Sequence, residues 1–260
     1  MRNRKLIIEI PYGGLGDHLF HSHLPRIAKE TGEYDKVFIS KKSLFRHSDN
    51  MHIVWELNPY IDGFTDEKGI TCNIMNITKK IAEKRLENNL LDEIMLAYGL
   101  DDGKRSHEPE NYYKPNYIPE YHKVIFDPNF LSWIGEIDKK DMMAYIKKKK
   151  IKFDAIMKIR TNQALYIPKP GDNFIETKTL TDFCNLIFSC KKLYCLTSGT
   201  ATLAASLGKH AIVFFGENQE YAYQHSKLHN YIKVEKCFQN QLKSFVKNNI
   251  FNLNKHKLIC

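Results

Sequence analysis

The sequence predicts an α/β fold of two small domains that face each other across a cleft. Three observations support this prediction. Short apolar runs alternate with segments of helical spacing along most of the 260 residues. Each half carries one glycine-bearing turn directly after an apolar run, at the carboxyl end of a predicted strand. A polar segment with three prolines, residues 101–119, separates the halves, so the predicted domains are 1–112 and 113–260.

The composition is that of an ordinary globular protein, with 43% hydrophobic and 27% charged residues. No run approaches the roughly 20 apolar residues of a membrane span, and the first residues pass straight into a strand, so we expect a cytoplasmic protein. The net charge of +9 fits a phosphate-bearing partner. The lysines form no array interleaved with aromatic residues, so nucleic acid is not expected, whereas an anionic small molecule or a lipid surface stays open.

Cysteines and histidines predict no metal site. The six cysteines contain no CxxC pair and are expected to be reduced thiols. Three histidines, His18, His21 and His23, crowd one predicted helix. Only two of them share a helix face, and no acidic residue is spaced to complete a ligand set. We therefore expect these histidines to line an anionic substrate cleft or the surface.

The glycine-bearing turn of the first half follows a predicted strand at 5–10 and contains Gly13, Gly14 and Gly16. A helix is predicted to begin near Asp17. A carboxylate at a helix start is stabilised, and its oxygens would face the mouth of the turn. Asp17 is therefore a candidate catalytic carboxylate, with a plain helix N-cap as the alternative.

The other elements of the first half follow from hydrophobic spacing. Pro25 lies inside the first predicted helix and indicates a kink or a restart. Further along, the pattern predicts strands at 36–40 and 53–57, a short extended run at 72–77, and one long helix at 78–98 ended by Gly99.

The second half repeats the alternation of strands and helices. Strands are predicted at 123–126, 154–159, 174–176, 192–196, 211–215 and 231–234, and helices at 138–149, 181–189, from Thr200, and at 239–251. The strand at 154–159 would deliver Lys158 and Arg160 to the sheet edge where open α/β sheets bind ligands. Glu217 follows the strand at 211–215 and is a candidate hydrogen-bond acceptor for a ribose or sugar hydroxyl, or simply an exposed loop acid.

The most informative stretch is 197–209, which connects two predicted strands. A turn carrying Ser198 and Gly199 leads into a helix expected to open at Thr200, with Thr202 in its first turn. Unpaired N–H groups and the positive end of the helix dipole would meet at the strand tip, which suits a phosphate or diphosphate. The alternative is an ordinary capped helix whose alanines serve only close packing on a sheet.

Motifs in both halves together resemble a known family. Gly14-Leu15-Gly16-Asp17-His18-Leu19 with Leu24-Pro25 is similar to the start of the ADP-heptose lipopolysaccharide heptosyltransferases. Thr197-Ser198-Gly199, followed by Thr202-Leu203-Ala204-Ala205-Ser206-Leu207-Gly208 and Val213-Phe214-Phe215-Gly216, is similar to the signature of their second domain. The motifs occur in the family's order and spacing, although the firm matches cover only about forty residues.

The resemblance implies a GT-B fold, in which two Rossmann-like domains face a cleft. It also implies an inverting, metal-independent glycosyl transfer without a cofactor, from a nucleotide-diphosphate sugar held by the second domain. By resemblance, Asp17 is the general base, and Ser198, Gly199 and Thr200 bind donor phosphates. Relatives use a basic residue of the second domain there, for which Lys158 and Arg160 are candidates. The family's Asp and His are replaced by Thr197 and Thr202, so the donor's identity is not inherited.

The expected activity is the transfer of a sugar, with heptose favoured by the resemblance, to a surface-glycan or lipid-linked acceptor. The basic charge would favour peripheral contact with the inner membrane face. Two alternatives stay open: a nucleotide-sugar-binding protein without catalysis, and a nucleotide-sugar hydrolase on the same scaffold. No Asp-x-Asp motif occurs, so metal-chelated donor phosphates are not expected.

Overall fold

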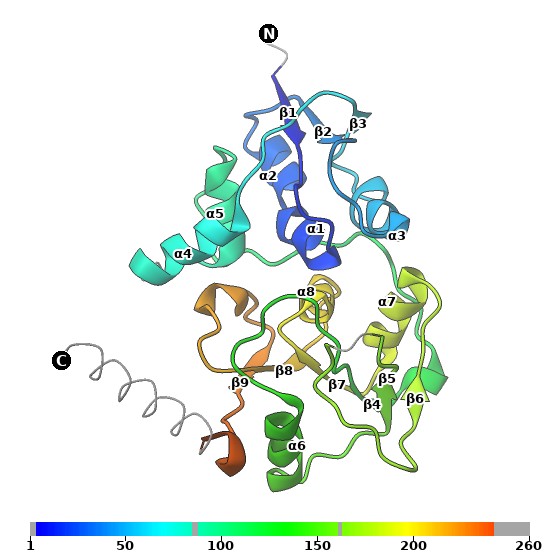
Figure 1. Cartoon of the computed structure of the whole chain (residues 1–260). Coiled ribbons are helices and arrows are strands. Elements are labelled where there is room, and N and C mark those ends of the chain that lie inside the picture. Colours follow the sequence, from blue (N-terminus) through cyan, green and yellow to red (C-terminus); the bar gives the residue numbers. More distant parts are fainter. Residues whose placement is uncertain (1–3, 85–87, 161–162, 242–260) are drawn as a thin grey trace, which may run out of the picture.

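The chain forms two α/β halves stacked one above the other, as predicted (Figure 1). The structure is a computed structural model that describes residues 4–84, 88–160 and 163–241. In the described residues, no helix combines the length and apolar character needed to cross a membrane.

The first half is built on a parallel sheet in the order β1-β2-β3. Its strands are β1 (Lys5–Ile8), β2 (Lys36–Ser40) and β3 (Gly63–Thr65). The helical elements around it are α1 (Leu15–His21), α2 (Leu24–Glu30), α3 (Ser48–Asn50), a π-helical turn (Met51–Glu56), α4 (Ile74–Lys84) and α5 (Leu90–Ala97). The predicted restart at Pro25 is confirmed, because this proline lies in the first turn of α2.

Three predictions for the first half are wrong. The run at 53–57 belongs to the π-helical turn, whose Trp55 is fully buried, because a short apolar run fits a buried helix as well as a strand. The extended run at 72–77 contains the start of α4. The long helix at 78–98 is two helices, since the Asn89 side chain accepts the Asp92 N–H at 2.9 Å and starts α5 afresh.

The second half is a six-stranded parallel sheet in the order β6-β5-β4-β7-β8-β9. Its strands are β4 (Val124–Phe126), β5 (Ala155–Met157), β6 (Phe174–Ile175), β7 (Lys192–Leu196), β8 (Ala211–Phe215) and β9 (Asn230–Lys233). The helical elements are 3₁₀ turns at Pro119–Tyr121 and Tyr221–Tyr223, α6 (Lys139–Lys148), α7 (Leu180–Ser189) and α8 (Gly199–Ser206). The helix predicted at 239–251 lies mostly outside the described residues.

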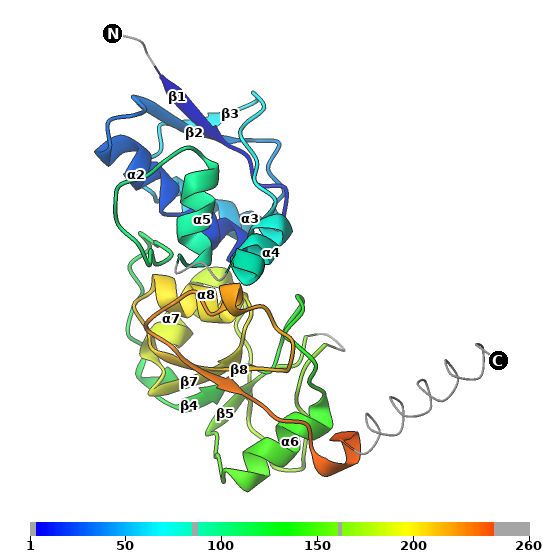
Figure 2. The same ribbon diagram turned by 90° about the vertical axis from the view of Figure 1, so that its left-hand side faces the viewer.

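The two faces of this sheet are covered differently (Figure 2). Helices α7 and α8 lie on the face toward the first half, and α6 lies on the opposite face. Successive strand residues point to opposite faces, so Cys195 of β7 packs toward α7 and α8 while Tyr194 packs with the α6 side. The core under α7 and α8 continues without a break into the first half. The two halves therefore share one hydrophobic core.

The halves meet where α1 packs against α8. A side chain carbon added at Gly16 would lie 3.4 Å from the Gly199 Cα, so each helix start touches the other through a glycine. The chain passes between the halves near residues 110–113: the Glu110 N–H donates to Ser22 of the first half, and the Tyr113 hydroxyl donates to Asn185 of the second. The domain boundary at 112/113 stays a prediction.

Candidate functional site

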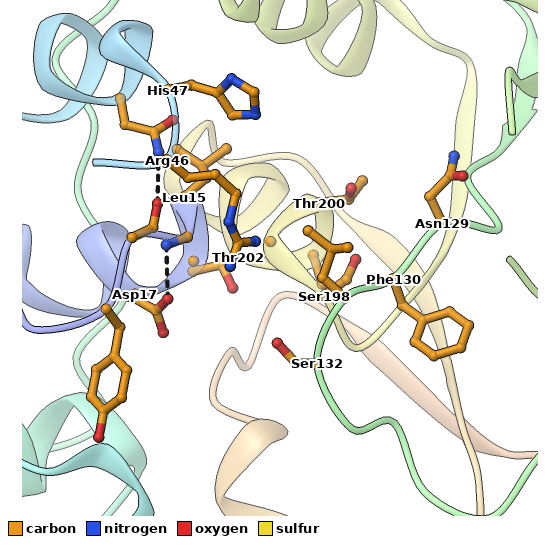
Figure 3. Close-up of a pocket in the computed structure, with 18 of the residues that line it drawn as sticks. Leu15, Asp17, Arg46, His47, Asn129, Phe130, Ser132, Ser198, Thr200 and Thr202 are labelled. Atoms are coloured by element: carbon orange, nitrogen blue, oxygen red, sulfur yellow. Dashed lines mark hydrogen bonds between the residues drawn. The ribbon is translucent and has the colours of Figure 1, made fainter. Parts of the chain in front are cut away.

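A cavity of about 1160 Å³ lies between the two halves, and most of the predicted site residues line it (Figure 3). On the first half they are Gly13, Gly14, Gly16 and Asp17; on the second half they are Arg160, Ser198, Gly199, Thr200 and Thr202. Lys158 and Glu217 do not contribute to the lining. The two glycine-bearing turns thus face each other across one space.

Asp17 is the third residue of α1, and one of its carboxylate oxygens accepts the Gly14 N–H at 3.0 Å. Gly14, and not Asp17, is the N-cap residue. Burial raises the pKa of the Asp17 carboxyl, and the Gly14 hydrogen bond and the positive charge of Arg46 oppose that rise. A carboxylate whose pKa lies above its usual range is a better proton acceptor, and it lines the cavity here.

The glycines of this turn allow two close approaches. A side chain at Gly13 would lie 3.0 Å from the main-chain nitrogen of Arg46, whose N–H donates to the Gly13 carbonyl at 2.9 Å. A side chain at Gly14 would lie 2.7 Å from the Asp17 carboxylate. The turn therefore needs small residues so that both the following carboxylate and the Arg46 loop can approach its backbone.

The facing turn begins α8 one residue earlier than predicted, at Gly199, with Ser198 as the N-cap residue. The Ser198 hydroxyl is buried and has no hydrogen-bond partner among the residues that the structure describes, and Ser198 lines the cavity. The Thr200 hydroxyl is already used, because it donates to a carboxylate oxygen of Asp127 at 2.6 Å. Ser198, Thr202 and the first N–H groups of α8 are therefore the groups of this turn that can donate to an anion.

Asp127 is a buried residue of the site that the sequence reasoning did not assign. It follows β4, and its other oxygen accepts both the backbone and side-chain N–H groups of Asn129. The Asn129 side chain in turn accepts the Arg160 N–H at 3.0 Å and donates to the Lys158 carbonyl. Through these hydrogen bonds, Asp127 and Asn129 connect the start of α8 to the loop after β5. The position of Asp127 immediately after a predicted strand was the available signal.

The predicted cations take different positions. The Lys158 ammonium pairs with Glu176 at 2.8 Å on the surface, so the structure does not bring this lysine to the cavity. The Arg160 guanidinium donates to the hydroxyl of Thr177 at 3.0 Å at the cavity wall. Two further cations, Arg46 and Lys178, line the cavity and were missed. Neither belongs to a motif, so no sequence signal identified them.

Glu217 lies away from the cavity lining. It pairs with Lys233 at 3.3 Å and with Lys236 at 3.8 Å, as the alternative of a surface loop acid predicted. Glu220 and Tyr223, which come slightly later in the same segment, line the cavity.

The expectation that the three histidines line a cleft or the surface is wrong. His18, His21 and His23 are all fully buried, and each ring donates to a main-chain carbonyl, of Leu44, Asp17 and Leu91 respectively. Burial lowers the pKa to about 4 for His18 and His21 and to about 3 for His23, so all three are neutral at pH 7. In the part of the chain that the structure describes, no group of three or more His, Cys, Asp or Glu side chains is arranged to hold a metal ion.

No family model and no curated protein matches the sequence. Solved structures do match the fold. A glycosyl transferase of family 9 from Veillonella parvula aligns over 95% of this chain and 89% of its own, with 11% identity and a TM-score of 0.51. The heptosyltransferase WaaC of E. coli, solved with ADP, aligns over 95% and 99%, with 9% identity and a TM-score of 0.53.

A third match is the iron-containing dodecameric heptosyltransferase TibC of enterotoxigenic E. coli, solved with ADP-D-β-D-heptose. It aligns over 91% of this chain with 14% identity and a TM-score of 0.59, and this chain covers 64% of its length. The chain therefore has the GT-B-like fold of these proteins. The fold expected from the sequence motifs is confirmed.

Proposed function

We propose that the chain is an inverting glycosyltransferase that uses a nucleotide-diphosphate sugar, with Asp17 as the general base. The observation that carries the proposal is that one cavity holds a carboxylate of raised pKa on one wall and, on the other, a helix start without a side-chain cap. Transfer needs a base for the acceptor hydroxyl and donors for the departing diphosphate. The GT-B-like fold and the sequence motifs support the same activity.

In the proposed reaction, the acceptor oxygen attacks C1 of the donor sugar while its proton passes to a carboxylate oxygen of Asp17. The new bond forms between the acceptor oxygen and C1. The bond between C1 and the phosphate oxygen breaks, and its electron pair stays on that oxygen. The nucleoside diphosphate leaves with one additional negative charge, which Ser198 and the first N–H groups of α8 face.

Three finer parts of the proposal rest on the resemblance and on the structural matches. The donor sugar is a heptose, as in the ADP-heptose complex of TibC. The transfer needs neither a metal ion nor a cofactor. The acceptor is a surface glycan or a lipid-linked glycan, which the basic protein approaches at a membrane surface. EDTA-treated enzyme with full activity would support metal independence, and co-sedimentation with anionic liposomes that is lost at high salt would support the membrane contact.

The deciding experiment measures sugar transfer and nucleotide binding in the same preparation. Thermal shift against ADP, GDP, UDP and CMP identifies the nucleotide, since a ligand of the folded state raises the melting temperature. We expect Asp17→Asn to keep that shift and to lose about 100- to 10,000-fold in turnover. Asp66→Asn, an exposed aspartate outside the cavity, is the matched control and should keep its activity.

Each alternative has its own outcome. Full turnover in Asp17→Asn would overturn the base assignment. Nucleotide binding without transfer in the unaltered protein would indicate a binding protein, and release of free sugar without an acceptor would indicate a hydrolase.

A further inference from the structure

The main chain around Arg46 is fixed to the core of the first half. The Arg46 N–H donates to the Gly13 carbonyl at 2.9 Å. Two residues earlier, the Leu44 carbonyl accepts a ring N–H of His18 at 2.8 Å. The Trp55 indole N–H donates to the other ring nitrogen of His18 at 2.9 Å, so the imidazole proton lies on the side that faces Leu44. A buried histidine thus holds the loop that carries Arg46.

The Arg46 side chain points from this loop into the cavity, toward the turn that carries Ser198 (Figure 3). In the described ranges, its guanidinium has neither a hydrogen bond nor an ion pair, and its charge acts on the Asp17 carboxylate. Arg160, by contrast, donates to Thr177. Arg46 therefore presents its donors to the cavity, together with the Lys178 ammonium.

The facing turn lacks a cation of its own. The first turn of α8 contains no acidic and no basic side chain, and the polar groups there are the hydroxyls of Ser198, Thr200 and Thr202 and the backbone N–H groups. A diphosphate gains one negative charge when its bond to C1 breaks, so a fixed cation close to it lowers the barrier. Arginine suits this position because its planar fork binds two phosphate oxygens at once.

We infer that Arg46 contributes a catalytic cation from the opposite half and binds the diphosphate of the donor as it departs. This inference rests on the proposed function and adds a residue to it. Arg46 is anchored on Gly13, and the adjacent Gly14 binds the Asp17 carboxylate. The base and the cation for the leaving group are thus aligned on one glycine turn, and a bound donor contacts both halves.

The first test is binding of inorganic pyrophosphate, ADP, GDP and UDP to the whole chain by calorimetry. We expect Arg46→Gln to weaken pyrophosphate and the preferred nucleotide about 10- to 100-fold, in line with a charge-assisted hydrogen-bonded pair. Arg46→Lys keeps the charge without the fork and should recover part of the loss. Arg105→Gln is the matched control, since its side chain pairs with Asp101 outside the cavity.

The second test is the dependence of turnover on pH. The charge of Arg46 opposes the burial-driven rise in the pKa of Asp17, so Arg46→Gln should move the acid limb of the profile to higher pH. A role limited to folding would lower turnover evenly at all pH values. Lys178→Gln tests the lysine that also lines the cavity. It should weaken pyrophosphate binding less than Arg46→Gln does, because a lysine offers no planar fork.

The outcomes separate the two hypotheses. If the unaltered chain binds neither pyrophosphate nor any nucleotide, the proposed function fails and the inference fails with it. If the unaltered chain binds and Arg46→Gln binds equally well, only the inference is overturned. If Arg46→Gln raises the KM for the acceptor and leaves diphosphate affinity unchanged, Arg46 serves the acceptor, and the inference is again overturned.

Discussion

The starts of α1 and α8 have the same local architecture and opposite chemistry. Each follows a strand, passes through a glycine-bearing turn and meets the other at the junction of the halves. In α1 the third residue, Asp17, uses its carboxylate to accept the N–H of the Gly14 N-cap. In α8 the third residue is Ala201, and no acidic side chain occupies the first turn. One helix start carries its own anion, and the other has neither an acidic side chain in its first turn nor a side-chain cap.

The start of α5 shows that burial of an acid at this position is not sufficient to raise its pKa. Asp92 occupies the same place in α5 as Asp17 does in α1. Burial alone would raise its pKa, but four hydrogen bonds, from the Asn89 N–H, the Ser106 N–H and two groups of His107, lower it to about 2. Asp17 has one such bond and a raised pKa. The number of donors around a buried carboxylate therefore decides the direction in which its pKa shifts.

The test with the largest expected effect gives α8 an acid at its third residue, the position that Asp17 has in α1. Ala201→Asp should place a carboxylate at this helix start. Two like charges about 4 Å apart near a protein surface repel by about 4 kcal/mol, so we expect diphosphate binding up to about 1,000-fold weaker. Ala201→Asn has the same shape without the charge and should bind far better. Calorimetry with pyrophosphate measures the difference, and equal affinities of the two variants would contradict the open-site interpretation.

A second test concerns Asp92, whose carboxylate accepts four hydrogen bonds. The hydrogen bond from the His107 ring to Asp92 is the main cause that raises the pKa of His107, so the pair stabilises the fold at pH values below the unfolded histidine pKa of 6.5. That stability is lost as the pH rises through the higher folded pKa. We expect His107→Gln to cost about 1.5–3 kcal/mol at pH 6 and less at pH 9.

Chemical denaturation at both pH values measures this change. His52→Gln removes an exposed histidine that pairs with Glu56 and serves as the control. A loss for His107→Gln that is the same at pH 6 and pH 9 would show that His107 is neutral in the fold.

The test with the smallest expected effect removes the Ser198 hydroxyl. Ser198→Ala deletes one donor at the start of α8 and should weaken pyrophosphate binding only about 2- to 10-fold, the value of one ordinary hydrogen bond. Because that hydroxyl has no hydrogen-bond partner in the described part of the chain, the free energy of unfolding should change little without ligand. A loss of stability together with unchanged binding would assign Ser198 to helix capping alone.

The sequence predicted the parts of the site that depend on local structure. Glycines after a strand and hydroxyl residues before a helix have short-range conformational meaning, so Asp17 and Ser198 could be placed at facing helix starts. Arg46 could not be placed, because its position depends on a loop that a buried histidine ring fixes in three dimensions. The strand predicted at 53–57, which contains Trp55, was wrong because a short apolar run does not reveal whether its backbone is extended or helical.

The glycine contact between α1 and α8 would be the pivot of any rotation between the two halves, and it lies close to Asp17 and Ser198. Gly16 precedes Asp17 and Gly199 follows Ser198, so each key residue has its Cα about 3.8 Å from the contacting glycine. A rigid rotation displaces an atom in proportion to its distance from the pivot. A rotation of one half on the other would therefore change the width of the cavity mouth strongly, while the span from Asp17 to Ser198 would stay nearly constant.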